Sequence, residues 1–285
     1  MNLAKQHENN CKISGKVVSI ESREGVKDGK TYLGGTMKVE TAPDNLVEVK
    51  FYANEITNKG AANKVYASLQ TVVREYKSIE TNGREQADSV EITGASLSEN
   101  AYYTQNLAFV RDFEVRGSFF NRNKQGVDPE ATFTVVGEIF SIDEEIKNDE
   151  PTGDLIVRML VVGYGNRANV LDFKVKGEKA VGYVNSTFSK GMEVKVQGTI
   201  VVEEIITEKK EEVAFGKPII EQTRRVRKEL VITSATAPVD SMISDEERNT
   251  MLAERESMLT GKKAEMEKKN KGTTAAPKTG ANFSL

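Results

Sequence analysis

The sequence lacks the features on which several common classes of protein depend. Its 285 residues include no Trp, a single Cys and a single His. One cysteine, Cys11, excludes an internal disulfide framework and suits a reducing compartment, so we expect a cytoplasmic protein. No run of about 18 apolar residues occurs, and the first residues lack the apolar core of a secretion signal. We therefore expect no membrane span.

Catalytic and cofactor-binding motifs are also missing. His7, which we expect in a mobile N-terminal segment, and Cys11 are too few for a zinc site or a Ser-His-Asp triad. Residues 25–31 resemble a phosphate-binding loop, but three residues separate the glycines where the motif has four. Residues 163–168 have glycines like those of a dinucleotide-binding fingerprint, but they join two expected strands. We predict a protein that is not an enzyme and has no metal or cofactor.

Charge is abundant but nearly balanced. Charged residues make up 29% of the chain, yet the net charge is only −3 and the pI is about 5.6. This balance argues against a strongly basic nucleic-acid protein, so any binding to nucleic acid has to come from local patches. At 38% hydrophobic residues the chain can bury real cores, and its length fits roughly two domains with a tail.

One pattern of strands occurs twice. Residues 12–20 and 134–142 each set a glycine inside an alternating apolar run and close it with Ser-Ile. Further along, residues 90–94 are echoed by residues 194–198. Two small β domains in tandem are the simplest explanation of both echoes.

Alternating and helical periodicities predict the same order of elements in both units. In the first unit we expect three strands, a helix and two strands, at residues 12–21, 36–41, 46–53, 63–77, 89–97 and 108–120. In the second unit the corresponding elements are expected at residues 132–142, 155–162, 170–175, 178–188, 192–207 and 224–234. Turns are expected at residues 24–30 and 163–168, and an acidic loop at 143–154. The predicted domains are residues 1–125 and 126–240.

The composition changes near residue 240, and we predict a third region at residues 241–285. Ser244 and the three acids after it are typical of a helix N-cap, and the helix is expected to run to about residue 269. Its apolar residues form a short stripe that could pack on a β domain or on a sister chain: Met251, Leu252, Met258 and Leu259. Residues 271–285, rich in Gly, Thr, Ala and Pro, are expected to be disordered.

The order of elements resembles the OB-fold, a five-stranded barrel whose first strand bends at a glycine. Gly15 and Gly137 take that place, and Val-x-Ile/Val-x-Gly runs end at Gly94 and Gly198. Over residues 12–238 the sequence is similar to the tandem OB-fold single-stranded DNA-binding proteins of bacteriophages, particularly those of Gram-positive hosts. The resemblance implies a mostly β protein with two OB-fold barrels, each with a helix, that acts in the host cytoplasm in phage DNA replication or recombination.

The C-terminus departs from the bacterial relatives of these proteins. Those relatives end in an acidic tail with a few apolar residues, and the tail recruits replication enzymes. Here residues 278–285 keep Phe283 and Leu285 but contain no acid. We therefore expect any contact with replication or recombination proteins to involve the C-terminal helix.

Single-stranded DNA binding by such a barrel requires cations along the phosphates and aromatic faces on which bases stack, each base worth about 1 to 3 kcal/mol. Alternation puts Lys50 and Tyr52 on one strand face, opposite apolar neighbours. The candidate binding residues of the first unit are Arg23, Lys27, Lys30, Tyr32, Lys38, Lys50, Tyr52, Tyr102, Tyr103, Arg111 and Arg116. The alternative for each is an ordinary solvated strand residue, whereas Phe51, Phe113 and Phe133 are expected in the core. Tyr102 and Tyr103 are expected in a loop.

In the second unit the candidates are Arg158, Tyr164, Arg167 and Lys174. Residues 224–228 form the densest basic cluster of the chain. They could hold phosphates, or they could balance acids on the partner strand, namely Glu203, Glu204, Glu208, Glu211 and Glu212, and we favour balance. The second unit is then expected to bind nucleic acid more weakly than the first.

We therefore predict a protein that binds single-stranded DNA without strong sequence preference and protects exposed strands. The main rival is a protein-binding adaptor that contacts a host or viral protein, which a slightly acidic surface would suit. A continuous positive stripe would separate DNA binding from that rival. Single-stranded RNA is a third possibility, because stacking platforms accept either sugar. The oligomeric state is not predicted.

Overall fold

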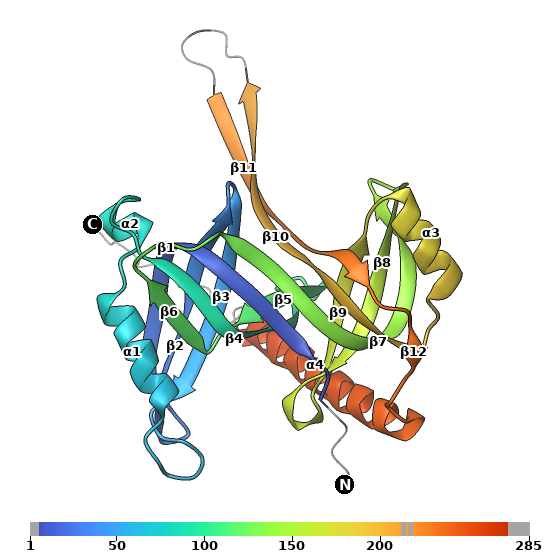
Figure 1. Cartoon of the computed structure of the whole chain (residues 1–285), viewed down its shortest axis with the longest axis horizontal. Helices are drawn as coiled ribbons and strands as arrows, with labels where there is room; N and C mark the ends of the chain where they lie inside the picture. Colours follow the sequence, from blue (N-terminus) through green and yellow to red (C-terminus); the bar gives the residue numbers. More distant parts are fainter. Residues whose placement is uncertain (1–5, 212–214, 216–218, 273–285) are drawn as a thin grey trace, which may run out of the picture.

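The computed structural model describes residues 6–211, 215 and 219–272. Glu212 and nearly all of the segment expected to be disordered, residues 271–285, lie outside these ranges. The side chains of Glu208 and Glu211 also lie outside the described part. Within it the chain is mostly β-structure, and Figure 1 shows two barrels side by side.

Five strands close the first barrel, which we call barrel 1. They are β1 (Asn9–Lys27), β2 (Lys30–Ala42), β3 (Asn45–Asn54), β4 (Ser89–Tyr103) and β5 (Phe109–Arg116). Strand β1 pairs antiparallel with both β2 and β4, while β3 pairs antiparallel with β2 and parallel with β5. The antiparallel pair of β4 and β5 completes the ring. Strand β6 (Phe119–Asn123) adds to β4 beyond the end of β5.

Barrel 2 repeats this arrangement. Its strands are β7 (Glu130–Lys147), β8 (Glu150–Val162), β9 (Ala168–Val175), β10 (Met192–Glu211) and β11 (Ile219–Ala235). Strand β7 pairs with β8 and β10, β9 pairs with β8 and runs parallel to β11, and β10 pairs with β11. A short β12 (Val239–Asp240) borders β10. The expected mostly β fold of two five-stranded barrels is confirmed.

Gly15 lets β1 approach β2 closely enough to bend between two partners. A Cβ at this position would lie 2.0 Å from the carbonyl oxygen of Glu40, so a side chain cannot fit without moving the backbone. The register between β1 and β2 shifts just after this point, between Val17 and Ser19, and β7 shows a shift at the equivalent place. One strand can thus serve both halves of each barrel.

Two segments expected to be a turn and a loop are instead β-hairpins. Residues 24–30 continue β1 and β2 up to a tight turn at Asp28 and Gly29, whose φ angles are 51° and 73°. Residues 143–154 likewise form the ends of β7 and β8 around Asn148 and Asp149, with φ angles of 50° and 64°. These residue types tolerate the left-handed conformation that a short hairpin turn needs, so the strands continue to the turn.

The helix predictions are confirmed, with one short addition. Helix α1 (Lys64–Glu75) begins at Asn63, whose side chain accepts a hydrogen bond from the amide of Val65. Helix α3 (Glu178–Thr187) takes the same place in barrel 2. The single turn α2 (Ile79–Asn82) follows α1 and was not expected.

His7 is not in a mobile segment, contrary to expectation. Its side chain is only 6% exposed, and its Nδ1 accepts a hydrogen bond from the amide of Val162 at 3.2 Å. Its Nε2 lies 3.5 Å from a carboxylate oxygen of Glu193. The N-terminal segment is therefore tied to barrel 2 before it enters β1.

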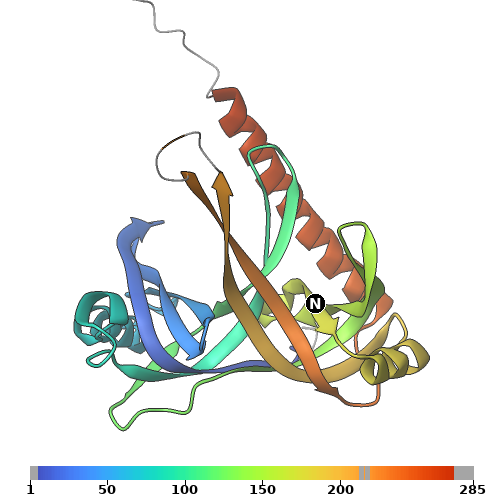
Figure 2. The same cartoon turned by 90° about the horizontal axis from the view of Figure 1, so that it is seen from above.

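Helix α4 (Asp245–Gly272) spans both barrels, as Figure 2 shows. Ser244 caps it, because the Ser244 hydroxyl accepts from the amide of Glu247 and donates to its carboxylate. Met251 packs with apolar residues of β8 and β9, while Arg255 donates to the Glu99 carboxylate of β4 at 2.7 Å. Met258, two turns after Met251, is 52% exposed.

The two barrels share one continuous network of strands and ion pairs. Residues 9–14 of β1 pair with residues 130–135 of β7. Between β5 and β9, Arg111 holds Asp172 at 2.8 Å. The phenylalanines expected in the core, Phe51, Phe113 and Phe133, are all buried. None of the described helices is long and apolar enough to span a membrane.

Candidate nucleic-acid interface

The register of β2 and β3 lays out a grid of side chains on the outer face of barrel 1. Gly34 lies opposite Tyr52, and Thr36 lies opposite Lys50. Strand β1 extends these rows, because Arg23 pairs with Gly34 on the other side. Core residues such as Leu33 and Val49 alternate with these positions and point inward. The side chains of the grid therefore point outward.

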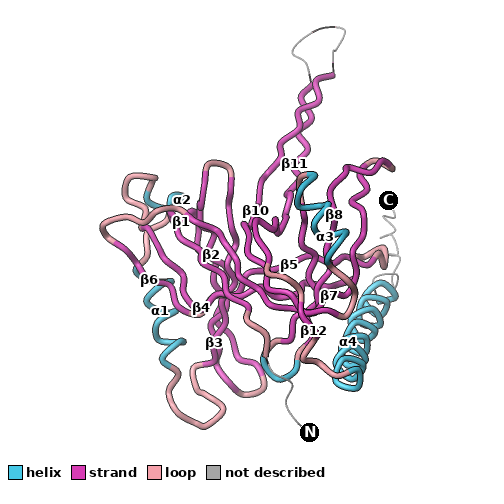
Figure 3. The backbone as a smooth tube through the Cα atoms, turned by 45° about the vertical axis from the view of Figure 1, so that its right-hand side comes forward, coloured by secondary structure: helices cyan, strands magenta, loops and turns pink. Residues whose placement is uncertain are grey.

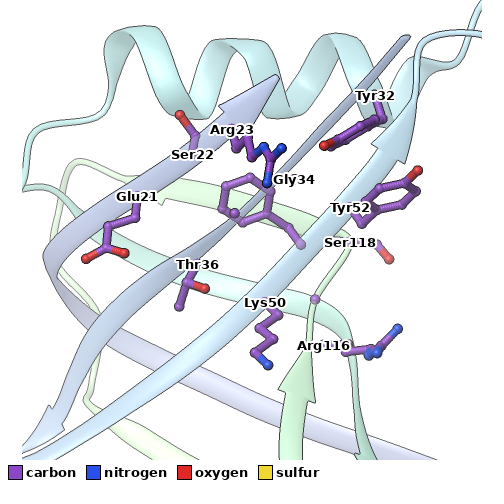
Figure 4. A pocket seen from close by; sticks show the side chains of 13 residues that line it. Glu21, Ser22, Arg23, Tyr32, Gly34, Thr36, Lys50, Tyr52, Arg116 and Ser118 are labelled. Carbon is purple, nitrogen blue, oxygen red and sulfur yellow. The ribbon is translucent and has the colours of Figure 1, made fainter. Parts of the chain in front are cut away.

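These side chains surround a cleft of about 710 Å³. Figure 4 shows Tyr32 and Tyr52 at one end of the cleft and Lys50 and Arg116 at the other. Its lining comes from β1, β2 and β3, from the end of β5 and from the two residues after it: Glu21, Ser22, Arg23, Tyr32, Gly34, Gly35, Thr36, Lys50, Phe51, Tyr52, Arg116, Gly117 and Ser118. The volume is suited to one or two small planar groups.

An aromatic pair forms one wall of the cleft. The rings of Tyr32 and Tyr52 stack with centroids 5.3 Å apart and an interplanar angle of 25°. Tyr52 is 54% exposed, and its hydroxyl donates to the Asn54 side chain at 2.9 Å. Gly34, the cross-strand partner of Tyr52, has no side chain to cover the ring. The pair is thus a rigid stacking surface that is still open to a ligand.

The other end of the cleft carries two cations that share one carboxylate. Lys50 Nζ lies 2.6 Å from Glu114 Oε2, and Arg116 Nε donates to Glu114 Oε1 at 2.6 Å. Burial alone would raise the pKa of Glu114, but the hydrogen bonds from Lys50 and Arg116 outweigh it and lower that pKa. Arg23 makes no ion pair with any other described residue. Arg23, Lys50 and Arg116 face two carboxylates, Glu21 and Glu114, so the cleft carries an excess of one positive charge.

The remaining candidates of barrel 1 lie outside the cleft. Lys27 and Lys30 are exposed on the β1–β2 hairpin, with Lys30 donating to Asn58, and Lys38 lies 3.6 Å from Glu48. Tyr102 and Tyr103 belong to β4 and not to a loop, which corrects the expectation.

These two tyrosines also differ in their surroundings. Tyr102 is 43% exposed, whereas the ring of Tyr103 packs against Phe109 with centroids 5.4 Å apart. Lys263 of α4 lies over the same ring at 5.8 Å. Tyr103 therefore contributes to the packing of α4 and has little free face for a base.

Barrel 2 has a counterpart of the cleft that its own carboxylates close. Lys174 pairs with Ile156 as Lys50 pairs with Thr36, so the two lysines occupy equivalent positions. Lys174 is only 5% exposed, and its Nζ lies 2.7 Å from Glu145 and within 3.5 Å of Asp154 and Glu229. We leave Lys174 out of the interface for this reason.

The other candidates of barrel 2 are divided between the barrel junction and an exposed turn. Arg158 donates to Asp172 within barrel 2, and Arg111 of barrel 1 holds the same carboxylate, so Arg158 lies at the barrel junction and Arg111 joins the barrels. Tyr164 and Arg167 lie on the turn between β8 and β9, where Tyr164 is 90% exposed. No cleft among the described pockets includes either residue.

The basic cluster at residues 224–228 pairs mainly with acids. Arg227 lies 2.6 Å from Glu203, Arg224 lies 3.6 Å from Glu204, and Lys228 lies 2.9 Å from Asp112. Cross-strand balance is therefore the role that the described contacts favour.

Sequence reasoning missed several contributors to the cleft. Gly34 and Gly35 form a glycine pair inside a strand, a signal of close backbone approach that could have been noticed. Thr36 and Ser118 carried no distinctive signal. Glu114, which positions both cations, looked like one of many strand acids.

Fold and site together define a two-barrel β protein with one open cleft that combines stacked aromatic rings and cations. Among the described residues, no group of His, Cys, Asp or Glu side chains is arranged to hold a metal ion. Residues 7–270 match the model of the YorF family, and the chain belongs to the YorF family.

Comparisons with other proteins give weaker similarities. No curated protein matches the sequence. The wild-type single-stranded DNA binding protein from Thermus aquaticus has 12% identity and a TM-score of 0.47, covering 84% of this chain and 97% of that one. A deletion mutant of the same protein has 11% identity and a TM-score of 0.47, covering 84% of this chain and 98% of that one. A replication protein A heterotrimer bound to ssDNA has 10% identity and a TM-score of 0.24, covering 94% of this chain and 54% of that one. At TM-scores below 0.5 these similarities are too weak to assign a function.

Proposed function

We propose that this protein binds single-stranded DNA through the cleft of barrel 1, without catalysis, metal or cofactor. The observation that carries the proposal is the open stacked pair of Tyr32 and Tyr52 beside Lys50, Arg116 and Arg23. A base can stack on the exposed ring of Tyr52 while its phosphate meets the cations at the other end. We expect little sequence preference, because every base has a face that can stack on an aromatic ring.

The biological role that we propose is protection of exposed strands during phage DNA replication or recombination. Barrel 1 would hold the strand, and barrel 2, whose equivalent position is filled by Glu145, Asp154 and Glu229, would contribute little to affinity. Contacts with replication proteins would use the exposed surface of α4, which includes Met258.

Fluorescence anisotropy with labelled oligo-dT, beside its duplex form, tests the proposal. We expect the single strand to bind more tightly than the duplex, and Tyr52→Ala to weaken binding about 10-fold, since one stacked base contributes about 1 to 3 kcal/mol. Tyr183→Ala is the matched control, because Tyr183 is also about half exposed but lies on α3. Equal affinity of the wild type, Tyr52→Ala and Tyr183→Ala for oligo-dT would exclude this cleft as the site. No binding of oligo-dT at low salt would favour a protein-binding adaptor.

A further inference from the structure

A long two-stranded arm projects from barrel 2 away from both barrels (Figures 1 and 3). We define the arm as residues 203–211 of β10 and 219–227 of β11, which pair with each other along this whole length. Within the described chain, the outer edge of β10 pairs with β3 at a single position, Glu203 with Asn45, and β11 pairs with β9 only at Val231 and Ile232. Apart from Glu203, the described residues of the arm therefore pair only with each other, and both outer edges are unpaired.

The base of the arm is held firmly, so the arm is a positioned element. The Asn45 side chain, at the turn between β2 and β3, donates to the carbonyl of Ile200 at 3.0 Å and accepts from the amide of Val202 at 2.6 Å. Lys228 lies 2.9 Å from Asp112 of β5. Barrel 1 thus fixes the direction in which the arm leaves barrel 2.

Beyond this base the arm exposes more apolar surface than an isolated ribbon tolerates well. Ile205, Ile206 and Val226 are 43%, 50% and 60% exposed, and Phe215 between the two strands is 92% exposed. A two-stranded hairpin is at best marginally stable in water, and unpaired edges invite further strands. Burial of these side chains against a partner would stabilise the arm.

The charge pattern of the arm is self-complementary. On one face, Glu204 and Arg224 form a diagonal ion pair, 3.6 Å apart, and Ile206 and Val226 lie on either side of it. On the other face, Ile205 lies beside Arg225 and the pair of Glu203 with Arg227. Each face offers an acid, a base and at least one apolar side chain, so in a two-fold contact between identical surfaces each group can meet a complementary one of the other copy. Nucleic acid is a poorer occupant, because the acids lie among the arginines.

We infer that the arm is a self-association site, at which two copies of this chain pair through the faces that carry Ile206 and Val226. The occupant is a second copy, since the same patch supplies both signs of charge. The arm leaves beside the turn between β2 and β3, at the opposite end of these strands from Tyr32 and Tyr52. Pairing of two arms therefore leaves the cleft of barrel 1 open.

Sedimentation equilibrium from low to high micromolar concentration, without DNA, tests the inference. We expect the wild type to approach twice the 31.5 kDa chain mass and Ile206→Glu/Val226→Glu to stay at the mass of one chain. Met258→Glu, an equally exposed apolar position on α4, is the control and should behave as the wild type. A wild type that stays at the mass of one chain, or a double variant that still doubles, would overturn the inference.

A crosslinking experiment keeps the test decisive if the double variant folds poorly. Cys11 is buried, and burial raises the pKa of its thiol, so Val226→Cys would supply the one reactive thiol of the described chain. A short bismaleimide should join two Val226→Cys chains and leave Met258→Cys chains single. Single chains in both cases would contradict pairing at the arm. The proposed function places a short oligo-dT in the cleft, away from the arm. Its affinity therefore tests DNA binding separately from self-association.

Discussion

At the scale of single residues, the shape of the cleft depends on two adjacent glycines of β2 that are not equivalent. A Cβ at Gly35 would lie 2.2 Å from the Glu21 carbonyl oxygen and 2.5 Å from the Phe51 ring. A Cβ at Gly34 would lie 3.2 Å from the Tyr52 ring, and its other neighbours, 3.6 Å or more away, are at ordinary contact distance. Gly35 is therefore required by the barrel backbone, whereas Gly34 provides room beside the stacking surface.

We predict that Gly35→Ala lowers the free energy of unfolding by about 1 to 3 kcal/mol, because the new methyl group overpacks a fixed backbone. Gly34→Ala should change stability less but weaken oligo-dT binding, since its methyl group presses on Tyr52. Urea unfolding and anisotropy of the two variants measure both effects. Equal losses of stability would contradict this division between the two glycines.

A second prediction concerns pH and the carboxylates that close barrel 2. Burial alone would raise the pKa of Glu145, but hydrogen bonds from Lys174, Thr152 and Lys147 outweigh it and lower the pKa to about 2. Because the folded-state pKa lies below the unfolded value, the stabilisation is present above about pH 4.5 and is lost as the pH falls toward 2.

Glu145→Gln should therefore be less stable than the wild type at pH 7, by up to about 3 kcal/mol, and the difference should shrink below pH 4. Urea unfolding at pH 7 and pH 3 measures it. Glu150→Gln, at the exposed turn of the same hairpin, is the control and should match the wild type at both pH values. A Glu145→Gln deficit that is the same at pH 7 and pH 3 would rule out this linkage.

At the scale of elements, local patterns predict what depends on neighbours in sequence. The helical spacing of Val65, Leu69, Val72, Val73 and Tyr76 predicts α1. The alternation along β3 predicts that Tyr52 and Lys50 share its outward face. Asp28 and Gly29 carried a hairpin signal that was overlooked. The burial of Lys174 depends on Glu145 and Glu229, which are far apart along the chain, so no local pattern could reveal it.

Helix α4 shows the same limit. The start of α4 was predictable from the Ser244 cap. Its docking site was not, because the ion pair that anchors it joins residues that are 156 positions apart. Arg255 holds Glu99, whose side chain is 7% exposed and whose other hydrogen bond comes from the amide of Val170 in β9. One carboxylate of barrel 1 thus contacts both α4 and barrel 2.

We predict that Arg255→Ala lowers the free energy of unfolding by about 3 kcal/mol, because it leaves the Glu99 carboxylate buried without its cation. The double variant Glu99→Gln/Arg255→Met should lose much less, since no buried charge remains. Arg224→Ala removes a pair that is well exposed and should cost less than about 1 kcal/mol. Urea unfolding of the three variants separates these cases, and a double variant as unstable as Arg255→Ala would show that packing, and not charge, anchors α4.

At the scale of the whole molecule, two barrels with the same strand order have different surfaces. The position of Lys50 opens into a cleft, whereas the equivalent Lys174 is enclosed by three carboxylates. With a net charge of −3, the molecule as a whole does not attract nucleic acid. The electrostatic part of the affinity for a strand then has to come from the few cations of one cleft. Their small number limits how steeply the affinity can fall as the salt concentration rises.

The last prediction follows from that limit. Each phosphate neutralised on a single strand contributes about −0.7 to the slope of log K against log salt, so Arg23, Lys50 and Arg116 together predict a slope of about −2. Lys50→Ala should weaken binding and reduce the slope to about −1.4, whereas Tyr52→Ala should weaken binding with no change in slope. Anisotropy titrations of oligo-dT over a range of NaCl concentrations measure both. A wild-type slope steeper than about −4 would require about twice as many phosphate contacts as this cleft has cations, and the strand would then have to follow a longer path over the molecule.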